Sequence, residues 1–329
     1  MNQVFALSVA TIVTLGFSAV LVTRLERVGA RLGFTEALLG LLTALAANAP
    51  EITSAVTALL RGQRDIGVGV ILGSNVFNLA ALLGLGALVA GRISLHRRVV
   101  LFAGGVALWI ATLSVGAVTT WLPVGVALTL GLAVFIPYVL VSAAHQLPER
   151  IGIAPQWSAW LRRAIEQEEQ ELRVAIHPSR GSAFDAFTAG LALVAVVASS
   201  VVLEHSASSL GTKLHWSQAV VGGVVLAGVT SLPNAVAAVY LASRGRGAAV
   251  LSEALNSNNL NSLLGFLLPA AIIGLTHPPS ATITVAGFYI GMTIVSLIAA
   301  YWHRGLGRLA GTLIVAGYAC FVLVIVIAH

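Results

Sequence analysis

The fold is decided by one stretch of sequence that occurs twice. Residues 40–80 read GLLTALAANAPEITSAVTALLRGQRDIGVGVILGSNVFNLA, and residues 223–263 read GVVLAGVTSLPNAVAAVYLASRGRGAAVLSEALNSNNLNSL. The copies align without a gap at an offset of 183 residues, and eleven of the 41 aligned pairs are identical. Each copy places a proline, an Arg-Gly pair and Ser-Asn-x-x-Asn in the same register. This pattern indicates an internal duplication.

The composition is that of an integral membrane protein. Of the 329 residues, 58% are apolar and 9% are charged, with a mean hydropathy of +0.95, whereas a soluble domain carries about 25% charged residues. The net charge of +6 has to lie in loops, so it indicates placement across a lipid bilayer and not a nucleic-acid partner. The single cysteine, Cys320, excludes a disulfide framework and a cysteine-based metal centre.

Ten apolar runs are long enough to cross a bilayer as helices, which takes about 20 residues each. Strands of a membrane barrel are excluded, because they have about ten residues of alternating polarity. We therefore predict an all-α integral membrane protein with ten transmembrane helices. They lie near residues 4–23, 33–60, 66–90, 99–118, 121–143, 184–203, 216–243, 248–275, 281–302 and 308–328.

The basic residues set the orientation of these helices. With the amino terminus outside, fifteen of the 18 lysines and arginines fall in inside loops, and only Arg61, Arg64 and Lys213 fall outside. This bias predicts both termini outside and residues 144–183 in the cytoplasm, in the inner (plasma) membrane of a bacterial-type cell. The acidic run 166–171 is interpreted as a solvated surface, with a regulatory cation-binding patch as the alternative.

Five spans separate equivalent points of the two copies, and an odd number places the copies in opposite orientations. We predict two inverted five-helix repeats, residues 1–143 and 184–329, joined by a cytoplasmic linker, 144–183. The duplicated parts cover about 36–84 and 219–267. Inverted repeats are typical of secondary transporters, whose substrate site lies near the bilayer midplane at the repeat interface.

A proline lies in the middle of a long apolar run in each copy. Pro50 and Pro233 each lack a backbone donor and clash with the carbonyl four residues earlier, which frees carbonyls around 46–47 and 229–230. In lipid a freed carbonyl needs protein or water as a partner, and it is also a good cation ligand. A packing kink is the alternative, but the duplication favours a functional break.

Oxygen-bearing side chains gather beside these prolines. Glu51 is one of only two acidic residues that lie well inside apolar runs, where a carboxylate costs at least a few kcal/mol and is by default a functional hypothesis. Helical spacing places Asn48 on the face of Glu51, and Thr230 and Ser231 near the face of Asn234. Such oxygen ligands are typical of sites for hard cations, such as sodium, calcium and magnesium.

The second helix of each copy carries a matching polar face. Glu253, the other acidic residue inside a run, lies four residues before Ser257 and is expected either to line the site, to carry protons or to lie nearer the cytoplasmic mouth. Hydrogen bonding between neighbouring helices is the alternative role for the amides. The candidates on this face are Ser74, Asn75 and Asn78 in the first copy and Ser257, Asn258 and Asn261 in the second.

These motifs resemble the sodium/calcium exchanger (cation/calcium exchanger) superfamily, whose repeats typically read Thr-Ser-x-Pro-Glu and Gly-Ser-Asn-x-x-Asn/Asp. Residues 48–51 read Asn-Ala-Pro-Glu, 73–78 read Gly-Ser-Asn-Val-Phe-Asn, 230–234 read Thr-Ser-Leu-Pro-Asn and 256–261 read Asn-Ser-Asn-Asn-Leu-Asn. The resemblance implies alternating access, with the first and sixth helices sliding against an eight-helix core.

The resemblance also implies a ligand set. Glu51 would coordinate the transported cation, with Asn78 and Asn261 as further metal ligands. The remaining ligands that it implies are the backbone carbonyls of Ala47 and Thr230 and the side chains of Asn48, Ser74, Ser231 and Ser257.

Two positions depart from the family pattern. Asn234 stands where the family usually has a second acidic residue, and Asn48 replaces a Thr/Ser-type position. The Asn-Ala-Pro-acid variant is similar to the branch that contains the mitochondrial sodium/calcium exchangers. A site with one carboxylate compensates a divalent ion less well than a site with two. The departure therefore favours a monovalent or proton-coupled cycle, unless Glu253 reaches the cavity and restores part of the charge.

We predict a secondary active cation antiporter that exchanges Ca²⁺ or another cation for Na⁺ or H⁺, with small inorganic cations as partners and no cofactor. The alternatives are a monovalent cation/proton exchanger without calcium transport, a cation channel, an intramembrane enzyme or a structural subunit. An intramembrane hydrolase needs two acids or a nucleophile–base pair at one cavity, and only Glu51 and Glu253 are available as acids. The sequence contains no Gly-rich phosphate loop, so ATP-driven pumping by this chain alone is not expected.

Overall fold

The computed structural model describes residues 2–34, 36–143, 159–167, 181–243, 247–274 and 280–328. Most of the expected linker, 144–183, lies outside these residues, although 159–167 are helical. The first half contains α1 (Gln3–Arg31), α2 (Glu36–Ala47), α3 (Ala49–Leu60), α4 (Arg64–Asn78), the π-helix η1 (Leu79–Leu85), α5 (Gly86–Ala90), β1 (Arg92–Ser94), α6 (Arg97–Val118) and α7 (Val124–Ala143). The second half contains α10 (Ala183–Lys213), α11 (Gln218–Val220), the π-helix η2 (Val221–Leu226), α12 (Ala227–Thr230), α13 (Leu232–Ser243), α14 (Gly247–Leu260), the π-helix η3 (Asn261–Leu267), α15 (Leu268–Ile273), α16 (Ser280–Trp302), β2 (Gly305–Gly307) and α17 (Arg308–Ala328).

The membrane-spanning helical fold is confirmed, whereas the count of ten stays a prediction. Within the described residues, seven helices are long and apolar enough to cross a membrane, and the bent pair of Gln218–Thr230 and Leu232–Ser243 raises the number to eight. The expected spans 33–60 and 248–275 are not among them. The first is divided into α2 and α3, each of 12 residues, and the second contains the polar cluster at 256–259.

A short antiparallel ladder joins the two halves at one end of the helices. β1 pairs with β2, with Arg92 opposite Gly307 and Ser94 opposite Gly305. Arg92 also donates to the carbonyl of His303 at 3.1 Å. These strands contain three residues each, so they connect helix ends and do not change the helical class of the fold.

The centre of the molecule is built from the duplicated segments of both halves. The Arg64–Ala90 span is almost wholly buried, and it packs against η2, η3 and α16 from the second half. Glycines permit this approach: a Cβ on Gly73 would lie 2.2 Å from the carbonyl oxygen of Gly223, and one on Gly222 would lie 2.5 Å from that of Ile66. Small residues at helix contacts allow close packing where water supplies no driving force.

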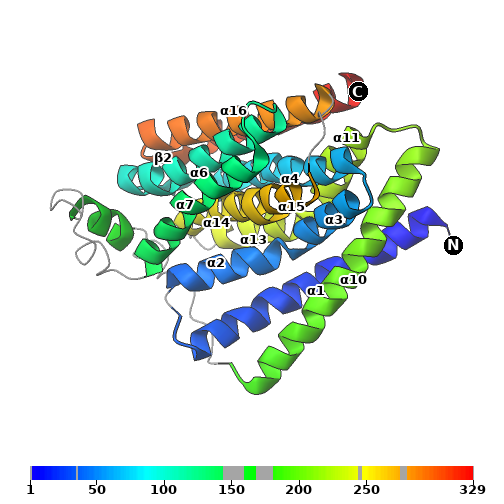
Figure 1. The fold of residues 1–329 in the computed structure, drawn as a ribbon. Coiled ribbons are helices and arrows are strands. Elements are labelled where there is room, and N and C mark those ends of the chain that lie inside the picture. Colours follow the sequence, from blue (N-terminus) through cyan, green and yellow to red (C-terminus); the bar gives the residue numbers. More distant parts are fainter. Residues whose placement is uncertain are drawn as a thin grey trace.

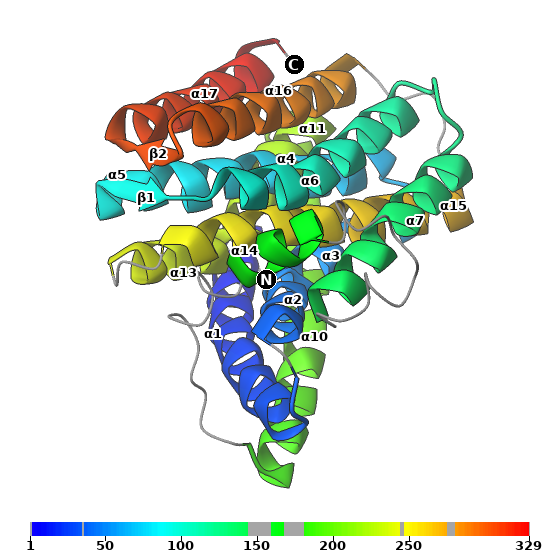
Figure 2. The same cartoon turned by 90° about the vertical axis from the view of Figure 1, so that its left-hand side faces the viewer.

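Two pairs of outer helices flank this centre on opposite sides. α1 and α10 lie side by side along one side, and α16 and α17 lie on the other (Figures 1 and 2). α1 and α10 are tied together by Thr14, which donates to Ser199 at 2.7 Å, and by Arg24, which pairs with Asp185 at 2.6 Å. Only about a third or less of each helix's apolar window is buried, so both helices present broad apolar faces for lipid.

The proline-containing part of each copy is broken into two helices, and the two breaks lie at equivalent positions. α2 and α3 meet at Asn48, and α12 and α13 meet at Ser231, again 183 residues apart. Pro50 and Pro233 are the second residues of the helices that follow, where a missing N–H costs no intrahelical bond. The prolines therefore start new helices instead of only kinking long ones, and α12 and α13 are bent by 45°.

Candidate cation site

Glu51 lies in the first turn of α3, at the break between α2 and α3, with no exposed surface. Its Oε1 accepts a hydrogen bond from Ser231 Oγ at 3.0 Å and one from Asn234 Nδ2 at 3.4 Å. Both donors belong to the other helix break, so the two breaks meet at this carboxylate. The positive end of a helix dipole stabilises an anion at this position.

The second oxygen of Glu51, Oε2, has no hydrogen-bond partner among the described residues. Nor do Ser74 Oγ and Asn261 Oδ1, which come from the partner helices of the two copies. A buried oxygen without a partner costs about 1–3 kcal/mol, and more for a charged group. A bound cation would relieve that cost at each of these atoms.

An amide network continues from Glu51 into the second helix of each copy. Asn234 Nδ2 also donates to Asn78 Oδ1 at 3.0 Å. Asn78 Nδ2 in turn donates to Asn258 Oδ1 at 3.1 Å and to Ser257 Oγ at 3.3 Å. The candidates Asn78, Asn234 and Ser257 are therefore brought together with Glu51 in one network.

Asn48 occupies the first helix break and joins it to α14. Its Nδ2 donates to the carbonyl of Ser257 at 2.8 Å, and its Oδ1 accepts from Ser257 Oγ. The residue is fully buried. The amide has its donor and its acceptor on separate atoms, so Asn48 makes both bonds at once and joins the two halves of the chain.

Asn75 and Asn258 form a reciprocal pair that displays the duplication in three dimensions. Asn75 Nδ2 donates to the carbonyl of Asn258 at 3.4 Å, and Asn258 Nδ2 donates to that of Asn75 at 3.1 Å. Asn261 Nδ2 donates to Asn75 Oδ1 at 3.2 Å, which mirrors the bond from Asn78 to Asn258. Asn75 and Asn258 therefore fit the alternative role of joining helices better than that of ligands.

The expected carbonyl ligands lie at the ends of the first half-helices. Ala47 is the last residue of α2, and Thr230 is the last residue of α12. The final carbonyls of a helix have no intrahelical partner and carry the negative end of the dipole. The Thr230 hydroxyl donates to the carbonyl of Leu226 at 2.8 Å, so its side chain is engaged within its own helix.

The structure places Glu253 apart from this network. Its electrostatic neighbour is Glu26 on α1, and it is partly exposed. Among the described residues no hydrogen bond joins Glu253 to Glu51 or to the amides around it.

Sequence reasoning missed Ser54. Its side chain is fully buried and its Oγ has no partner in the described part of the chain. It follows Glu51 by three residues on α3, and this spacing on one helix face is the signal that could have identified it.

The charge of the centre is low. No group of three or more His, Cys, Asp or Glu side chains that could hold a metal ion is found in the described residues. Any cation bound at the helix breaks therefore meets one carboxylate and several neutral oxygens. This donor set fits hard cations, with the charge of one anion to balance them.

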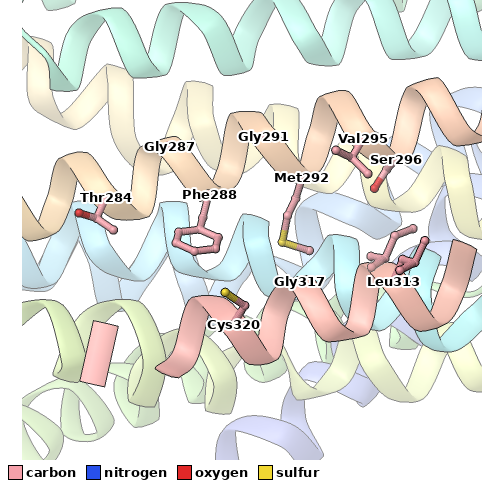
Figure 3. A pocket seen from close by; sticks show the side chains of 11 residues that line it. Thr284, Gly287, Phe288, Gly291, Met292, Val295, Ser296, Leu313, Gly317 and Cys320 are labelled. Carbon is pink, nitrogen blue, oxygen red and sulfur yellow. The ribbon is translucent and has the colours of Figure 1, made fainter. Parts of the chain in front are cut away.

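A groove of about 510 Å³ between α16 and α17 is chemically different (Figure 3). It contains neither a carboxylate nor an amide side chain, so it does not offer a cation site. Its lining residues are Thr284, Gly287, Phe288, Gly291, Met292, Val295, Ser296, Leu313, Ile314, Gly317 and Cys320.

Fold and site define a multi-pass membrane protein whose polar centre lies where two duplicated helix breaks meet. The family model described as "Sodium/calcium exchanger protein" matches residues 2–145 and 184–327. The chain therefore belongs to the sodium/calcium exchanger family, and so to a group of ion exchangers and not of enzymes.

Relatives and solved structures agree with this assignment. The chain is 27% identical to inner membrane protein YrbG of Escherichia coli (strain K12) over 286 residues, 82% of this chain and 79% of that protein. Its fold is similar to that of the sodium-calcium exchanger NCX_Mj, with a TM-score of 0.64, 20% identity and 98% of both chains covered. The H⁺/Ca²⁺ exchanger CAX matches with a TM-score of 0.68 and 11% identity, over all of this chain and 86% of that one.

Proposed function

We propose that the protein is a secondary active antiporter that carries a cation through the membrane by alternating access, with Glu51 as its central ligand. The observation that supports this best is the Glu51 carboxylate: it is buried between the two helix breaks, and its Oε2 has no partner among the described residues. Ser74 Oγ and Asn261 Oδ1 supply further free oxygens. Exchange is coupled because the buried charge must be neutralised before the core can cross between faces.

The proposed cargo is Na⁺ or H⁺ in exchange for Ca²⁺ or another cation. One proton or one Na⁺ balances the single charge of Glu51, whereas Ca²⁺ leaves an excess of one positive charge. Asn234 adds no charge and donates to Glu51 Oε1, which favours monovalent or proton exchange without calcium as the second candidate function. NCX_Mj and CAX are named as sodium–calcium and H⁺/Ca²⁺ exchangers, which supports the first candidate.

The proposed architecture is ten spans in two inverted repeats, residues 1–143 and 184–329, with 144–183 as a cytoplasmic linker. The matching breaks at Asn48 and Ser231 support it. We propose an inner-membrane location with both termini outside, supported by the distribution of lysine and arginine and by the location of the Escherichia coli relative.

Counter-flux in liposomes tests this function. Purified protein is reconstituted, and uptake of labelled sodium or calcium is measured against gradients of lithium, sodium, potassium, calcium, magnesium and protons. We expect uptake that depends on an opposing cation and that Glu51→Gln abolishes, because the substitution removes the only charge of the site. Glu166→Gln, the same change at an exposed glutamate, is the matched control. Wild-type flux in Glu51→Gln would falsify the proposal, and uptake without a counter-ion would indicate a channel.

A further inference from the structure

One face of α10 carries a row of polar residues that points toward the end of α3. Ser200, Glu204 and Ser208 follow at four-residue spacing, which places them above one another on one helix face. Glu204 Oε2 lies 3.0 Å from Arg61 Nη1, just after α3, and Gln63 Nε2 donates to Ser208 Oγ at 2.7 Å. This face of α10 is therefore directed at the interface with α3.

The carboxylate in this row is only half satisfied. The Glu204 side chain is fully buried, and its Oε1 has no hydrogen-bond partner in the described part of the chain. Arg61 is 40% exposed, and its Nη1 also contacts His205 Nδ1 at 2.7 Å. The arginine thus approaches the buried carboxylate from the surface and neutralises it from one side.

Two buried hydroxyls without partners in the described part of the chain lie on the same two helices as this ion pair and Glu51. Ser200 precedes Glu204 by one turn on α10, and Ser54 precedes Arg61 by two turns on α3, so each shares a helix face with one member of the ion pair. The two helices pack against each other. Each serine is fully buried, and the Oγ of each has no partner among the described residues. Within these residues, α10 and α3 therefore carry buried oxygens without partners at Glu204, Ser200, Ser54 and Glu51.

The same face of α10 is apolar toward its other end. Ala192 and Val196 continue the four-residue series, and with Ala189 they pack against Leu21 and Ala46 in a separate buried cluster. On one side of Glu51, this face of α10 is therefore covered by apolar side chains. On the other side, toward Arg61, the same face carries oxygen atoms.

We propose that Glu204, Ser200 and Ser54 form an entry site for the transported cation, and that Arg61 closes it as a tethered cation. An unpaired buried carboxylate is strongly unfavourable, so Glu204 exchanges Arg61 for the incoming cation when Arg61 turns to water. In the expected orientation this entrance is on the outer face. The inference rests on the proposed function, since the cation that enters is the one that Glu51 carries.

Thiol labelling tests whether Arg61 and Glu204 close this path. Cys320→Ser removes the only native thiol, and Ser54→Cys then reports access to the interface. A membrane-impermeant maleimide is applied to each side of oriented vesicles, with and without the charge-free pair Arg61→Gln/Glu204→Gln. We expect Ser54→Cys to be labelled about tenfold faster in the double variant, and from one side of the membrane only. This factor is the size of effect expected when a partly buried ion pair is lost.

The control position is Ser199→Cys, which lies next to Ser200 on α10 but contacts Thr14 of α1. Its labelling should not change in the double variant. Equal rates at Ser54→Cys with and without the ion pair would overturn the proposal. Faster labelling at both cysteines would also overturn it, because it would mean general loosening of α10.

Binding of the cation at Glu204 has its own measurement. In the single variant Arg61→Gln the carboxylate is free, so added sodium or calcium should slow the labelling of Ser54→Cys, and Glu204→Gln should remove this protection. Absence of protection would reduce Glu204 and Arg61 to a structural pair and overturn the entry site. Labelling measures access and not exchange, so a wild-type protein without counter-flux would count against the proposed function independently of these results.

Discussion

The contact between Glu51 and Asn234 sets the charge of the site at the scale of single residues. In a two-acid site, two carboxylates side by side repel one another until a divalent cation separates them. Here the second group is an amide whose Nδ2 bridges Glu51 Oε1 and Asn78 Oδ1. The site can therefore close around Glu51 without a divalent ion, which is consistent with a monovalent or proton load.

Restoring a second acid should change this preference. We expect Asn234→Glu to raise calcium affinity relative to sodium by roughly tenfold or more, because calcium sites gain affinity with ligand charge. Without calcium the variant should melt at a lower temperature than the wild type, since two buried carboxylates then lie together. Isothermal calorimetry measures the affinity, and unchanged or weaker calcium binding would contradict the charge argument.

Glu253 offers a contrasting test, because it is the other acidic residue inside the apolar runs. Its neighbour is Glu26 on α1, and among the described residues it shares no hydrogen bond with the Glu51 network. We therefore expect Glu253→Gln to retain most counter-flux under conditions in which Glu51→Gln has none. Loss of flux in Glu253→Gln, with the protein still folded in detergent, would assign Glu253 to proton or cation transfer.

The break in each duplicated helix is the main feature at the scale of elements. The sequence predicted breaks near Pro50 and Pro233, and the structure has them two residues earlier, at Asn48 and Ser231. The shift follows from local chemistry, because proline is favoured near the start of a helix and the preceding residues end the previous one. Periodicity cannot predict the π-helical turns η1 and η3, which start beside Asn78 and at Asn261, because they depend on packing between the halves.

Close helix packing at Gly73 gives a prediction for stability. We expect Gly73→Ala to destabilise the protein by about 1–3 kcal/mol, because its Cβ would lie 2.2 Å from the Gly223 carbonyl oxygen, which is backbone and cannot rotate away. Gly105→Ala is the matched control on α6, where a Cβ meets nothing within 4 Å. Thermal unfolding in detergent compares the two, and equal melting temperatures would contradict close packing of the two halves at Gly73.

At the scale of the whole molecule, the outer pair α1 and α10 is held differently from the centre. Thr14–Ser199 and Arg24–Asp185 bind the two helices to each other, while Arg61–Glu204 and Gln63–Ser208 bind α10 to the end of α3. Sequence could predict the duplication and the breaks beside Pro50 and Pro233, because they repeat at one offset, and it singled out Glu51 as a carboxylate inside an apolar run. It did not identify Glu204 or Ser54 by repetition, because the aligned positions 21 and 237 are leucine and alanine. The spacing of Ser54 from Glu51 on one helix face is the signal that remains for that residue.

These two sets of contacts predict opposite results of cross-linking. If α1 and α10 move together against the centre, a disulfide between Thr14→Cys and Ser199→Cys should leave counter-flux nearly unchanged, because it joins two parts of one moving unit. The two hydroxyl oxygens are 2.7 Å apart, which places the Cβ atoms near the separation that a disulfide needs.

A short bis-maleimide between Gln63→Cys and Ser208→Cys should instead stop counter-flux, because it fixes α10 to the centre. Both pairs are made with Cys320→Ser, each single cysteine treated with the same reagent is the control, and reduction should reverse only the disulfide. Arrest of exchange by the Thr14–Ser199 disulfide would mean that α1 and α10 slide against each other. Full exchange with α10 fixed to the turn after α3 would mean that α10 does not move during transport.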